Sequence, residues 1–381
     1  MLSVKRIVII AGEESGDRHA ANLVNQLKEW QPALQISGIG GRHMQNAGVH
    51  LISDLASFGV TGLSEVVRHL KVIKNAFDAI KCHLESTKPD LLILVDYPGF
   101  NLRLAKYAKQ ELGLRILYYI SPQIWAWKAN RIKAIRATID RMAVILPFEK
   151  ALYQKAGVPV SFVGHPLVDK VQYCNDVEAA RMHLNLPTHK RMIAMLPGSR
   201  RNEIEKHMPV LVQTAELLSQ QHTDIHFVIP IAQSLKPELI HSYFDKSKIS
   251  VSFTIGRATE VVACSDCVVV ASGTASLECA LLEKPMCIIY KASLLSYIAA
   301  MQVIKVKYLG LCNLLKNEMI VPELLQYDCN PKELSRVVTA LLTDNEVISR
   351  MVARLKQLKL SLSHQEADCS LAQLVQQELM V

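Results

Sequence analysis

Two short turns that follow apolar runs carry the residue types of a phosphate site. In the stretch 268–285, valines lead into Ser272-Gly273-Thr274, and residues 275–282 have the composition of a helix. The start of such a helix presents unpaired backbone N–H groups and the positive dipole end, which suit a diphosphate. Glu278, one turn into the helix, would repel phosphate but fits a vicinal diol of a ribose or sugar. The alternative is a capped helix with Glu278 in solvent.

The second turn, Pro197-Gly198-Ser199, is followed by Arg200 and Arg201 just before another predicted helix. Backbone N–H groups and a guanidinium at one strand end form a metal-free clamp for a diphosphate, because Arg supplies fixed donors together with charge. This motif alone is weak evidence for a phosphate site. If both turns end strands of one sheet, they project from the same edge and reinforce each other.

Asp96 is the candidate general base. It follows the apolar run 91–95 directly and precedes a proline turn, so its carboxylate lies at the carboxyl end of a predicted strand. The alternative is a structural Asp that accepts loop N–H groups. The segment 121–128 ends the next predicted strand with two tryptophans and a lysine, which suit a sugar or acyl contact, or the core.

A glycine-containing turn, residues 11–17, follows the first predicted strand. Gly12 and Gly16 allow close backbone approach to a ligand, and Ser15 and Asp17 can cap the predicted helix 17–30. Its spacing differs from the GxGxxG pattern of dinucleotide sites, so we do not expect a nicotinamide cofactor. A plain tight turn is the alternative.

These turns must be positioned by an α/β architecture, because strand-like runs alternate with helical periods along the chain. The predicted strands are 6–11, 35–39, 91–95, 116–120, 141–146 and 160–163, then 192–196, 225–229, 250–254, 267–270 and 286–289. They imply two doubly wound sheets in series, with ligand loops from both at a cleft. We expect the boundary after residues 164–166, in the polar stretch 173–177, and two helices after Pro331.

Length and charge narrow the class of protein. The 381 residues favour two domains. The net charge is +8, and residues 101–155 hold eleven Lys or Arg against three acids. This basic surface suits phosphate, anionic lipid or plain solvent. No zinc finger, RNA-binding signature or helix-turn-helix pattern is present, so we expect no nucleic-acid partner.

Cysteine usage and the N-terminal residues favour the cytoplasm. The nine cysteines are odd in number and scattered, and Cys264 with Cys267 lacks a second ligand pair, so buried thiols are expected rather than zinc. The first residues run directly into a strand and a polar turn, unlike a signal peptide.

The segment 58–80 has the pattern of an amphipathic helix. Its apolar stripe is Val66, Val67, Leu70, Ile73, Ala76 and Phe77, and its basic residues are Arg68, Lys71 and Lys74. The stripe faces either the core or a membrane surface whose phosphates meet the basic residues. The uncharged run 292–304, followed by Lys305 and Lys307, has the same two interpretations and is too short to span a bilayer.

Taken together, the motifs resemble the lipid-A-disaccharide synthases, which are inverting glycosyltransferases of the GT-B fold. The resemblance runs nearly end to end. It rests on GEESGD (12–17), DYPGFN (96–101), SPQIWAWK (121–128), LPFEK (146–150), FVGHP (162–166), LPGSR (196–200), SGTASLE (272–278) and CNLL (312–315). It implies a β-1,6 linkage between UDP-2,3-diacylglucosamine and 2,3-diacylglucosamine 1-phosphate, with release of UDP.

The resemblance also assigns roles to residues. Asp96 would deprotonate the acceptor 6-hydroxyl, with inversion at the anomeric carbon, and Gly99 stands where some family members carry a second acid. Residues that would hold the UDP-sugar are Ser199, Arg200, Ser272, Gly273, Thr274, Glu278 and Asn313. Residues assigned to the cleft or acceptor side are Gly12, Ser15, Gly16, Asp17, Asn101 and Gln123. Neither a metal nor a cofactor is expected.

For the whole chain the resemblance implies a peripheral enzyme on the cytoplasmic face of the inner membrane. It favours the membrane-surface interpretation of the helix, on an anionic leaflet, and a homodimer with exchanged C-terminal segments. The expected domains are an acceptor and membrane-facing domain, 1–170, a UDP-sugar domain, 171–340, and C-terminal helices, 341–381, that pack back on the first domain or a partner subunit.

Two alternatives remain open from the sequence. A UDP-N-acetylglucosamine 2-epimerase-like enzyme shares two facing sheets and a Glu on the ribose. It would not need the apolar and basic helix, so a dependence of activity on lipid or detergent separates the two. A non-catalytic, membrane-associated protein with a vestigial nucleotide site is the other alternative.

Overall fold

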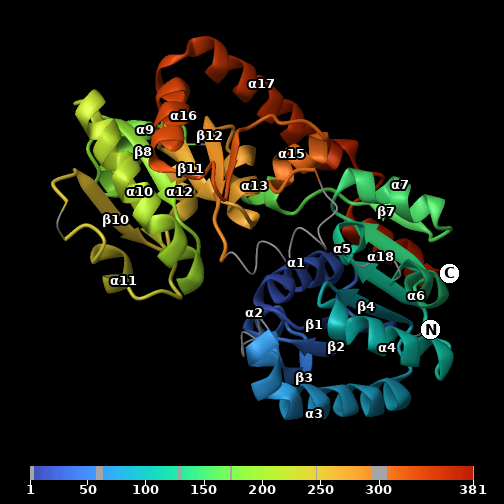
Figure 1. Ribbon diagram of the computed structural model, residues 1–381. Coiled ribbons are helices and arrows are strands. Elements are labelled where there is room, and N and C mark those ends of the chain that lie inside the picture. Colours follow the sequence, from blue (N-terminus) through green and yellow to red (C-terminus); the bar gives the residue numbers. More distant parts are fainter. Residues whose placement is uncertain are drawn as a thin grey trace. The chain divides into compact units, whose positions relative to one another are not determined.

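The computed structural model describes residues 4–56, 63–127, 131–171, 174–245, 247–293 and 307–380, with the backbone alone at 63–69 and 126–127. The chain divides into two compact units. The first comprises Met1–Pro166 and Leu362–Val381, and the second comprises Leu167–Ser361 (Figure 1). Each unit is built on one parallel sheet.

The sheet of the first unit has seven strands in the order β3-β2-β1-β4-β5-β6-β7. The strands are β1 Arg6–Ala11, β2 Gln35–Gly40, β3 His50–Asp54, β4 Leu91–Val95, β5 Ile116–Tyr119, β6 Arg141–Val144 and β7 Val160–Phe162. The sequence predicted all of these except β3. That strand lies at the sheet edge, pairs only with β2, and has only two apolar residues, so its pattern is weak.

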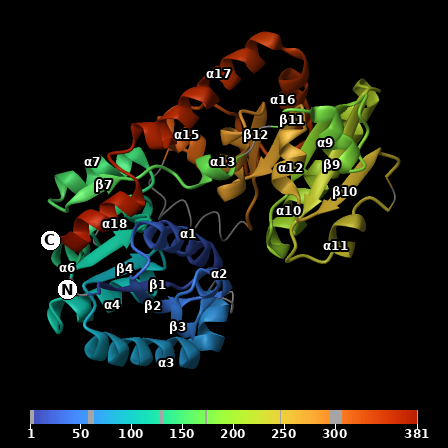
Figure 2. The same ribbon diagram turned by 180° about the vertical axis from the view of Figure 1, so that it is seen from behind.

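Helices cover both faces of this sheet, as Figures 1 and 2 show. They are α1 Glu14–Trp30, α2 Arg42–Asn46, α3 Leu63–Thr87, α4 Pro98–Gln110, α5 Ile124–Trp127, α6 Arg131–Thr138, α7 Pro147–Lys155 and α18 Leu371–Met380, with a short 3₁₀ turn at His364–Glu366. Alternate residues of β1 face opposite ways: Val8 and Ile10 pack with α3 and α4, whereas Ile7 and Ile9 pack with α1 and α18.

The sheet of the second unit has six strands in the order β10-β9-β8-β11-β12-β13. The strands are β8 Arg191–Leu196, β9 Ile225–Ile231, β10 Val251–Ile255, β11 Cys267–Ala271, β12 Met286–Tyr290 and β13 Glu323–Leu325. The three-residue β13 gives too little pattern to be predicted. The helices of this unit are α8 Leu167–Lys170, α9 Val177–His183, α10 Arg201–Gln221, α11 Glu238–His241, α12 Ala258–Ala263, α13 Thr274–Leu281, α15 Leu311–Lys316, α16 Pro331–Thr343 and α17 Asn345–Leu362.

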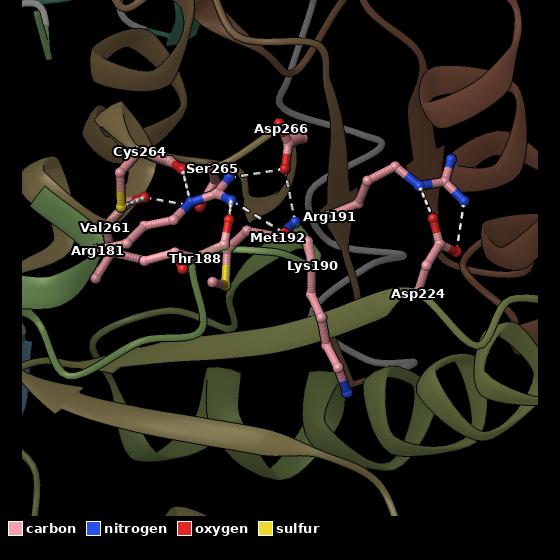
Figure 3. A network of polar contacts seen from close by, with 10 residues as sticks. All are labelled: Arg181, Thr188, Lys190, Arg191, Met192, Asp224, Val261, Cys264, Ser265 and Asp266. Atoms are coloured by element: carbon pink, nitrogen blue, oxygen red, sulfur yellow. Dashed lines mark hydrogen bonds and ion pairs between the residues drawn. The ribbon is translucent and has the colours of Figure 1, made fainter. Parts of the chain in front are cut away.

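A buried arginine fixes the amino ends of β8 and β11 in the second unit (Figure 3). Arg181 donates to the carbonyl oxygens of Cys264, Thr188 and Lys190, and its Nη2 lies 2.8 Å from Oδ2 of Asp266. The same Asp266 oxygen accepts the backbone N–H of Met192 at 2.6 Å. This network stabilises the edge of the sheet opposite to the one that carries the two phosphate-type turns.

The C-terminal residues are shared between the two units. Residues 341–361, which the sequence grouped with the terminal helices, lie in the second unit, and the division between units falls at Pro166 and Leu167. Three α-helices follow position 330 instead of the two expected. The last, α18, lies on the first unit, where Arg115 Nε donates to Oε2 of Glu378 at 2.7 Å.

Candidate functional site

Three predicted turns meet at the carboxyl edge of the first sheet because β1, β4 and β5 are neighbours. The turn after β1 contacts the turn after β4: a Cβ added to Gly12 would lie 2.2 Å from Cδ1 of Tyr97. Gly12 is therefore required for the packing of two loops. Gly16 is buried, and a Cβ added there would lie in ordinary contact, 3.6 Å from Ala11 and from Val95, so this glycine is not needed for close packing.

Asp17 does not cap the helix that contains it. Helix α1 begins at Glu14 without a side-chain cap, and Ser15 is exposed in its first turn. The buried carboxylate of Asp17 accepts the backbone N–H groups of Gly41, His43 and Met44 at 2.7, 2.9 and 3.1 Å, which belong to the N-cap and the first turn of α2. The capping role predicted for Ser15 and Asp17 on their own helix is wrong, because Asp17 caps a different helix.

Asp96 is held in a strained backbone conformation. Its φ is 47°, that of Tyr97 is 46°, and that of Ile120 at the end of β5 is 62°. Left-handed conformations are costly for such residues, and a β-branched residue there is a clear outlier. The backbone N–H of Asp96 donates to the Tyr119 carbonyl at 2.9 Å, and its carbonyl accepts the Tyr118 hydroxyl at 2.5 Å. The surrounding contacts thus maintain the strain.

Asp96 lines a cavity of about 270 Å³. The cavity is also lined by Pro98, Ile120, Ser121, Pro122, Gln123, Ile124 and Arg131. Burial, followed by the negative charge of Glu13, raises the pKa of Asp96 to about 6. A carboxylate with this pKa is ionised near neutral pH and is still basic enough to accept a proton, as a general base requires.

The two other residues predicted beside Asp96 occupy different positions. Asn101 is fully buried, and its Nδ2 donates to the carbonyl oxygens of Val95 at 3.2 Å and Asp96 at 2.8 Å. Its side chain therefore supports the backbone of Asp96. Gln123 is exposed and lines the cavity, so its side chain is available to a substrate.

Sequence reasoning missed Glu149, a buried carboxyl group on α7. Only 1% of Glu149 is exposed, and its Oε1 accepts the Ser121 hydroxyl at 2.6 Å and the Trp125 Nε1–H at 3.0 Å. Burial is the main reason that its pKa rises to about 7, and the charge of Asp96 adds to the shift. Glu149 anchors the loop that walls the cavity. Trp125 is thereby held within the protein, while the side chain of Trp127 and all of Lys128 lie outside the described residues.

The turn after β11 leaves backbone donors open. Gly273 has a φ of 153°, where a side chain is strained, although an added Cβ would meet nothing within 4 Å. Ser272 donates its hydroxyl to the Leu309 carbonyl at 3.3 Å, and α13 has no side-chain cap. Among the described residues, the N–H groups of Gly273, Thr274 and Ala275 have no acceptor. The simple capping interpretation is therefore wrong.

The turn after β8 lies beside it, since β8 and β11 pair directly, as expected from the two motifs. Its donors, however, are engaged. Oε2 of Glu203 accepts the backbone N–H groups of Ser199 at 2.9 Å and Arg200 at 3.2 Å. Oε1 of Glu203 pairs with Arg200 Nη1 at 3.0 Å, although the Arg200 side chain is 74% exposed. The N–H groups that the sequence assigned to a diphosphate clamp are thus bound by a carboxylate of α10 in this structure.

Glu278 and Asn313 are both near this edge of the second unit. Glu278 is half-buried on α13, one turn beyond Gly273. Asn313 is fully buried: its Nδ2 donates to Val321 O at 2.8 Å and Glu323 Oε1 at 2.7 Å, and its Oδ1 accepts two backbone N–H groups. All of its hydrogen-bonding positions are used, so its side chain positions α15 and the strand β13.

Helix α3 places one half of its apolar stripe on the core of the first unit and leaves Leu70 exposed. Ile73 and Phe77 pack partly buried against the core of the first unit, and Ala76 is buried, so this half of the stripe faces the protein. Leu70 is 55% exposed, and Lys71 and Lys74 are exposed. The side chains of Val66, Val67 and Arg68, and the segments 57–62 and 294–306, lie outside the described residues.

A family model described as lipid-A-disaccharide synthetase matches residues 7–379. A lipid-A-disaccharide synthase 1 of Legionella pneumophila (strain Philadelphia 1) is 59% identical over 379 residues, which cover 100% of this chain and 99% of the relative. A lipid-A-disaccharide synthase of Trichlorobacter lovleyi is 41% identical over 371 residues, which cover 97% of each chain.

Solved structures with low sequence identity share the fold. The glycosyltransferase of kitacinnamycin has a TM-score of 0.63 at 12% identity, with 99% of each chain covered. A UDP-N-acetylglucosamine 2-epimerase from Neisseria meningitidis bound to UDP-GlcNAc has a TM-score of 0.60 at 12% identity, with 94% of this chain and 99% of that chain covered. At such identities the similarity establishes architecture alone.

Proposed function

Because this chain belongs to the lipid-A-disaccharide synthase family, and is thus a hexosyltransferase of the GT-B fold that makes the lipid A disaccharide, we propose specific roles for its residues and substrates. The donor is UDP-2,3-diacylglucosamine and the acceptor is 2,3-diacylglucosamine 1-phosphate. The single observation that carries the catalytic assignment is the strained, half-buried Asp96 at the cavity in the first unit. The epimerase and scaffold alternatives do not agree with the family.

Asp96 is the general base of the proposed reaction. Its carboxylate takes the proton of the acceptor 6-hydroxyl as that oxygen forms a bond to the anomeric carbon of the donor. The bond from this carbon to the UDP oxygen breaks in the same displacement, and UDP leaves with the electron pair. Attack from the face opposite UDP converts an α donor into a β-1,6 product. The raised pKa of Asp96 and the nearby Gln123 support this assignment.

The edge formed by the turns after β8 and β11 binds the UDP part of the donor. The open N–H groups of Gly273 and Thr274 at the start of α13 receive diphosphate oxygens, and Glu278 accepts hydroxyl groups of the ribose. Arg200 exchanges its ion pair with Glu203 for the diphosphate, which its exposure permits. Ser199 and Ser272 belong to the same two turns. Asn313 supports this edge indirectly, by holding α15 against β13.

The substrates carry acyl chains, so we propose that the enzyme collects them from an anionic membrane surface. The exposed Leu70, Lys71 and Lys74 of α3 support a peripheral location on the cytoplasmic face of the inner membrane. None of the helices in the described part of the chain has both the length and the apolarity needed to cross a bilayer. A homodimer remains part of the proposal, and sedimentation of the purified protein tests it.

One assay tests the proposed reaction. Purified protein is mixed with UDP-2,3-diacylglucosamine and 2,3-diacylglucosamine 1-phosphate in detergent micelles, and UDP and the acylated disaccharide are measured. Both products should appear in equal amounts and only when the acceptor is present. No UDP release would overturn the assignment. UDP-N-acetylglucosamine serves as a control, since formation of its 2-epimer would support the epimerase alternative instead.

A further inference from the structure

His207 on α10 is completely buried and forms two directional hydrogen bonds. Its Nδ1 lies 2.7 Å from the carbonyl oxygen of Pro197, and its Nε2 lies 2.9 Å from the backbone nitrogen of Lys291. A carbonyl oxygen only accepts, so Nδ1 must carry a hydrogen. A backbone N–H only donates, so Nε2 must be bare. The contacts therefore fix one neutral tautomer of the ring.

The two groups bound by His207 belong to strands on either side of β11. Pro197 lies in the turn after β8, and Lys291 follows β12 directly. Strands β8 and β12 both pair with β11, whose end carries the turn Ser272-Gly273-Thr274. A single imidazole thus links the two loops that flank the open N–H groups of the central turn.

A second residue of α10, Glu203, holds the same turn through other backbone groups. Glu203 lies four positions before His207, so the two side chains leave the helix on one face. Glu203 binds the N–H groups of Ser199 and Arg200, whereas His207 binds the carbonyl oxygen of Pro197. Glu203 is half-buried beside the exposed Arg200, but His207 lies in the interior, where no substrate reaches it.

We propose that His207, in its neutral Nδ1–H form, is a positioning residue that sets the spacing of the β8 and β12 loops and thereby the affinity for the UDP part of the donor. This inference rests on the proposed function of that edge. No step of the chemistry requires His207. Its loss should raise KM for the donor more than it lowers kcat, because Asp96 is unchanged.

The arrangement also makes donor binding sensitive to acid. A proton added at Nε2 would face the Lys291 N–H, so the hydrogen bond would be lost. The groups around the ring are the Glu203 carboxylate, the Lys291 ammonium and the ring of Tyr290, whose centroid is 6.3 Å away. Burial lowers the pKa of His207 below its usual value, and this effect exceeds the opposing ones. Affinity for UDP should therefore fall only at acidic pH, as His207 becomes protonated.

The test compares UDP affinity by calorimetry between pH 5 and 8. The variants are His207→Leu, which loses both bonds, and His207→Asn, which can keep the bond to Pro197. The matched control is His189→Gln, because His189 is exposed in the same unit. We expect Leu to weaken UDP binding by about tenfold at pH 7.5, and Asn by less, because Asn keeps one of the two bonds that hold the loops. The terminal phosphate of UDP also takes up a proton at about pH 6, and the resulting loss of affinity is common to all the proteins; the additional loss in wild type and control should be absent from both variants.

A second readout separates this inference from the proposed function. Nitrogen NMR of labelled histidine should show the His207 ring with the proton on Nδ1 in the wild-type protein, with or without UDP. An Nε2–H ring, or unchanged UDP affinity and pH dependence in both variants, would overturn the inference. If wild-type protein does not bind UDP at all, the function assigned to this edge fails. In that case the tautomer of His207 seen by NMR, together with the pH dependence of the protein's unfolding temperature, tests the positioning role without UDP.

Discussion

Asp96 shows how one carboxylate is prepared for proton transfer at the level of a single residue. Three left-handed residues, Asp96, Tyr97 and Ile120, crowd the ends of β4 and β5, and each costs on the order of 1–3 kcal/mol. Burial then opposes ionisation of the carboxyl group. Both features reduce stability, and both place a basic oxygen at a cavity, which is the usual trade-off at a catalytic position.

Replacing Asp96 should abolish most turnover without preventing UDP binding. Asp96→Ala and Asp96→Asn remove the general base, and we expect kcat to fall by about 100-fold or more. Calorimetry with UDP should give an affinity close to that of wild type. Near-normal turnover in both variants would remove Asp96 from the mechanism.

The acidic limb of the pH profile should follow the charge on Glu13. The pKa of Asp96 is about 6, and Glu13 raises it, so kcat/KM should fall as pH drops through this region. Glu13→Gln removes a negative charge and lowers the pKa of Asp96, so activity should persist to lower pH. Glu14→Gln is the control, since Glu14 is exposed and pairs with Arg18 at 3.2 Å. Equal profiles in both variants would contradict the electrostatic link.

At the scale of elements, several motif residues hold one element against another. The side chain of Asp17 on α1 caps α2, and the side chain of Asn101 on α4 supports the backbone at the end of β4. In the second unit, Glu203 and His207 join α10 to the ends of β8 and β12. The resemblance to a family implied that Asp17 and Asn101 lie on the cleft or acceptor side, and the contacts that the structure shows for both side chains are with the protein backbone.

Removal of the Asp17 carboxylate should destabilise the first unit. Asp17→Ala leaves three backbone N–H groups of α2 without their acceptor, two of them in buried contacts, at a cost of about 1–3 kcal/mol. Urea unfolding monitored by circular dichroism measures the loss. Ser15→Ala, at an exposed position of the same turn, should change stability little. A similar effect from both variants would mean that the cap is unimportant.

Helix α3 should contribute to membrane binding through its exposed basic residues. Replacement of Lys71 and Lys74 with Ser removes two positive charges, each worth about 1 kcal/mol near an anionic surface. Sedimentation with vesicles rich in anionic lipid should show weaker binding, and more so at low salt. Lys155→Ser and Lys206→Ser together are a control of equal charge on other helices. Unchanged partitioning would leave α3 as a core-facing helix alone.

At the scale of the whole molecule, the chain contributes to the first unit twice. Residues from the C-terminal end, 362–381, complete a fold that begins at the N-terminus, and α18 covers the face of the sheet shared with α1. Glu378 is 8% exposed and meets Arg115 at 2.7 Å and Arg141 at 3.9 Å. The C-terminal helix α18 is thus held on the first unit by ion pairs as well as by the apolar packing of Leu374 and Val375.

Loss of the Glu378 carboxylate should loosen the first unit selectively. Glu378→Ala leaves two half-buried guanidinium groups without their partner, and we expect a cost of about 1–3 kcal/mol. Hydrogen exchange should accelerate in β5, β6 and α18, while β8 and β11 in the second unit keep their protection. Glu346→Ala, at an exposed site on α17, is the control. Equal acceleration in both units would mean that α18 is not specific to the first.

The sequence by itself determined the class of fold and the positions of the turns. Buried parallel strands are continuous apolar runs, so all the strands were predictable except the edge strand β3 and the three-residue β13. Glycine turns at Gly198 and Gly273, and the placement of Asp96 after β4, follow from local chemistry that needs no tertiary information. The same motifs indicated the family that the comparisons establish.

Only the tertiary structure decided which polar groups are free to bind and which are already used. Glu203 accepts the N–H groups of the turn after β8, and Asn313 bonds to backbone groups and to the carboxylate of Glu323. Glu149 and His207 are buried and hold loops in place. The groups that these side chains bind lie on other elements or just before their own helix. Whether a side chain binds the backbone or a ligand therefore depends on distances in the folded chain, which spacing in the sequence does not give. Asp17 and Asn101 illustrate the same limit, because a polar residue in a motif has the same letter whether it faces a substrate or a helix end.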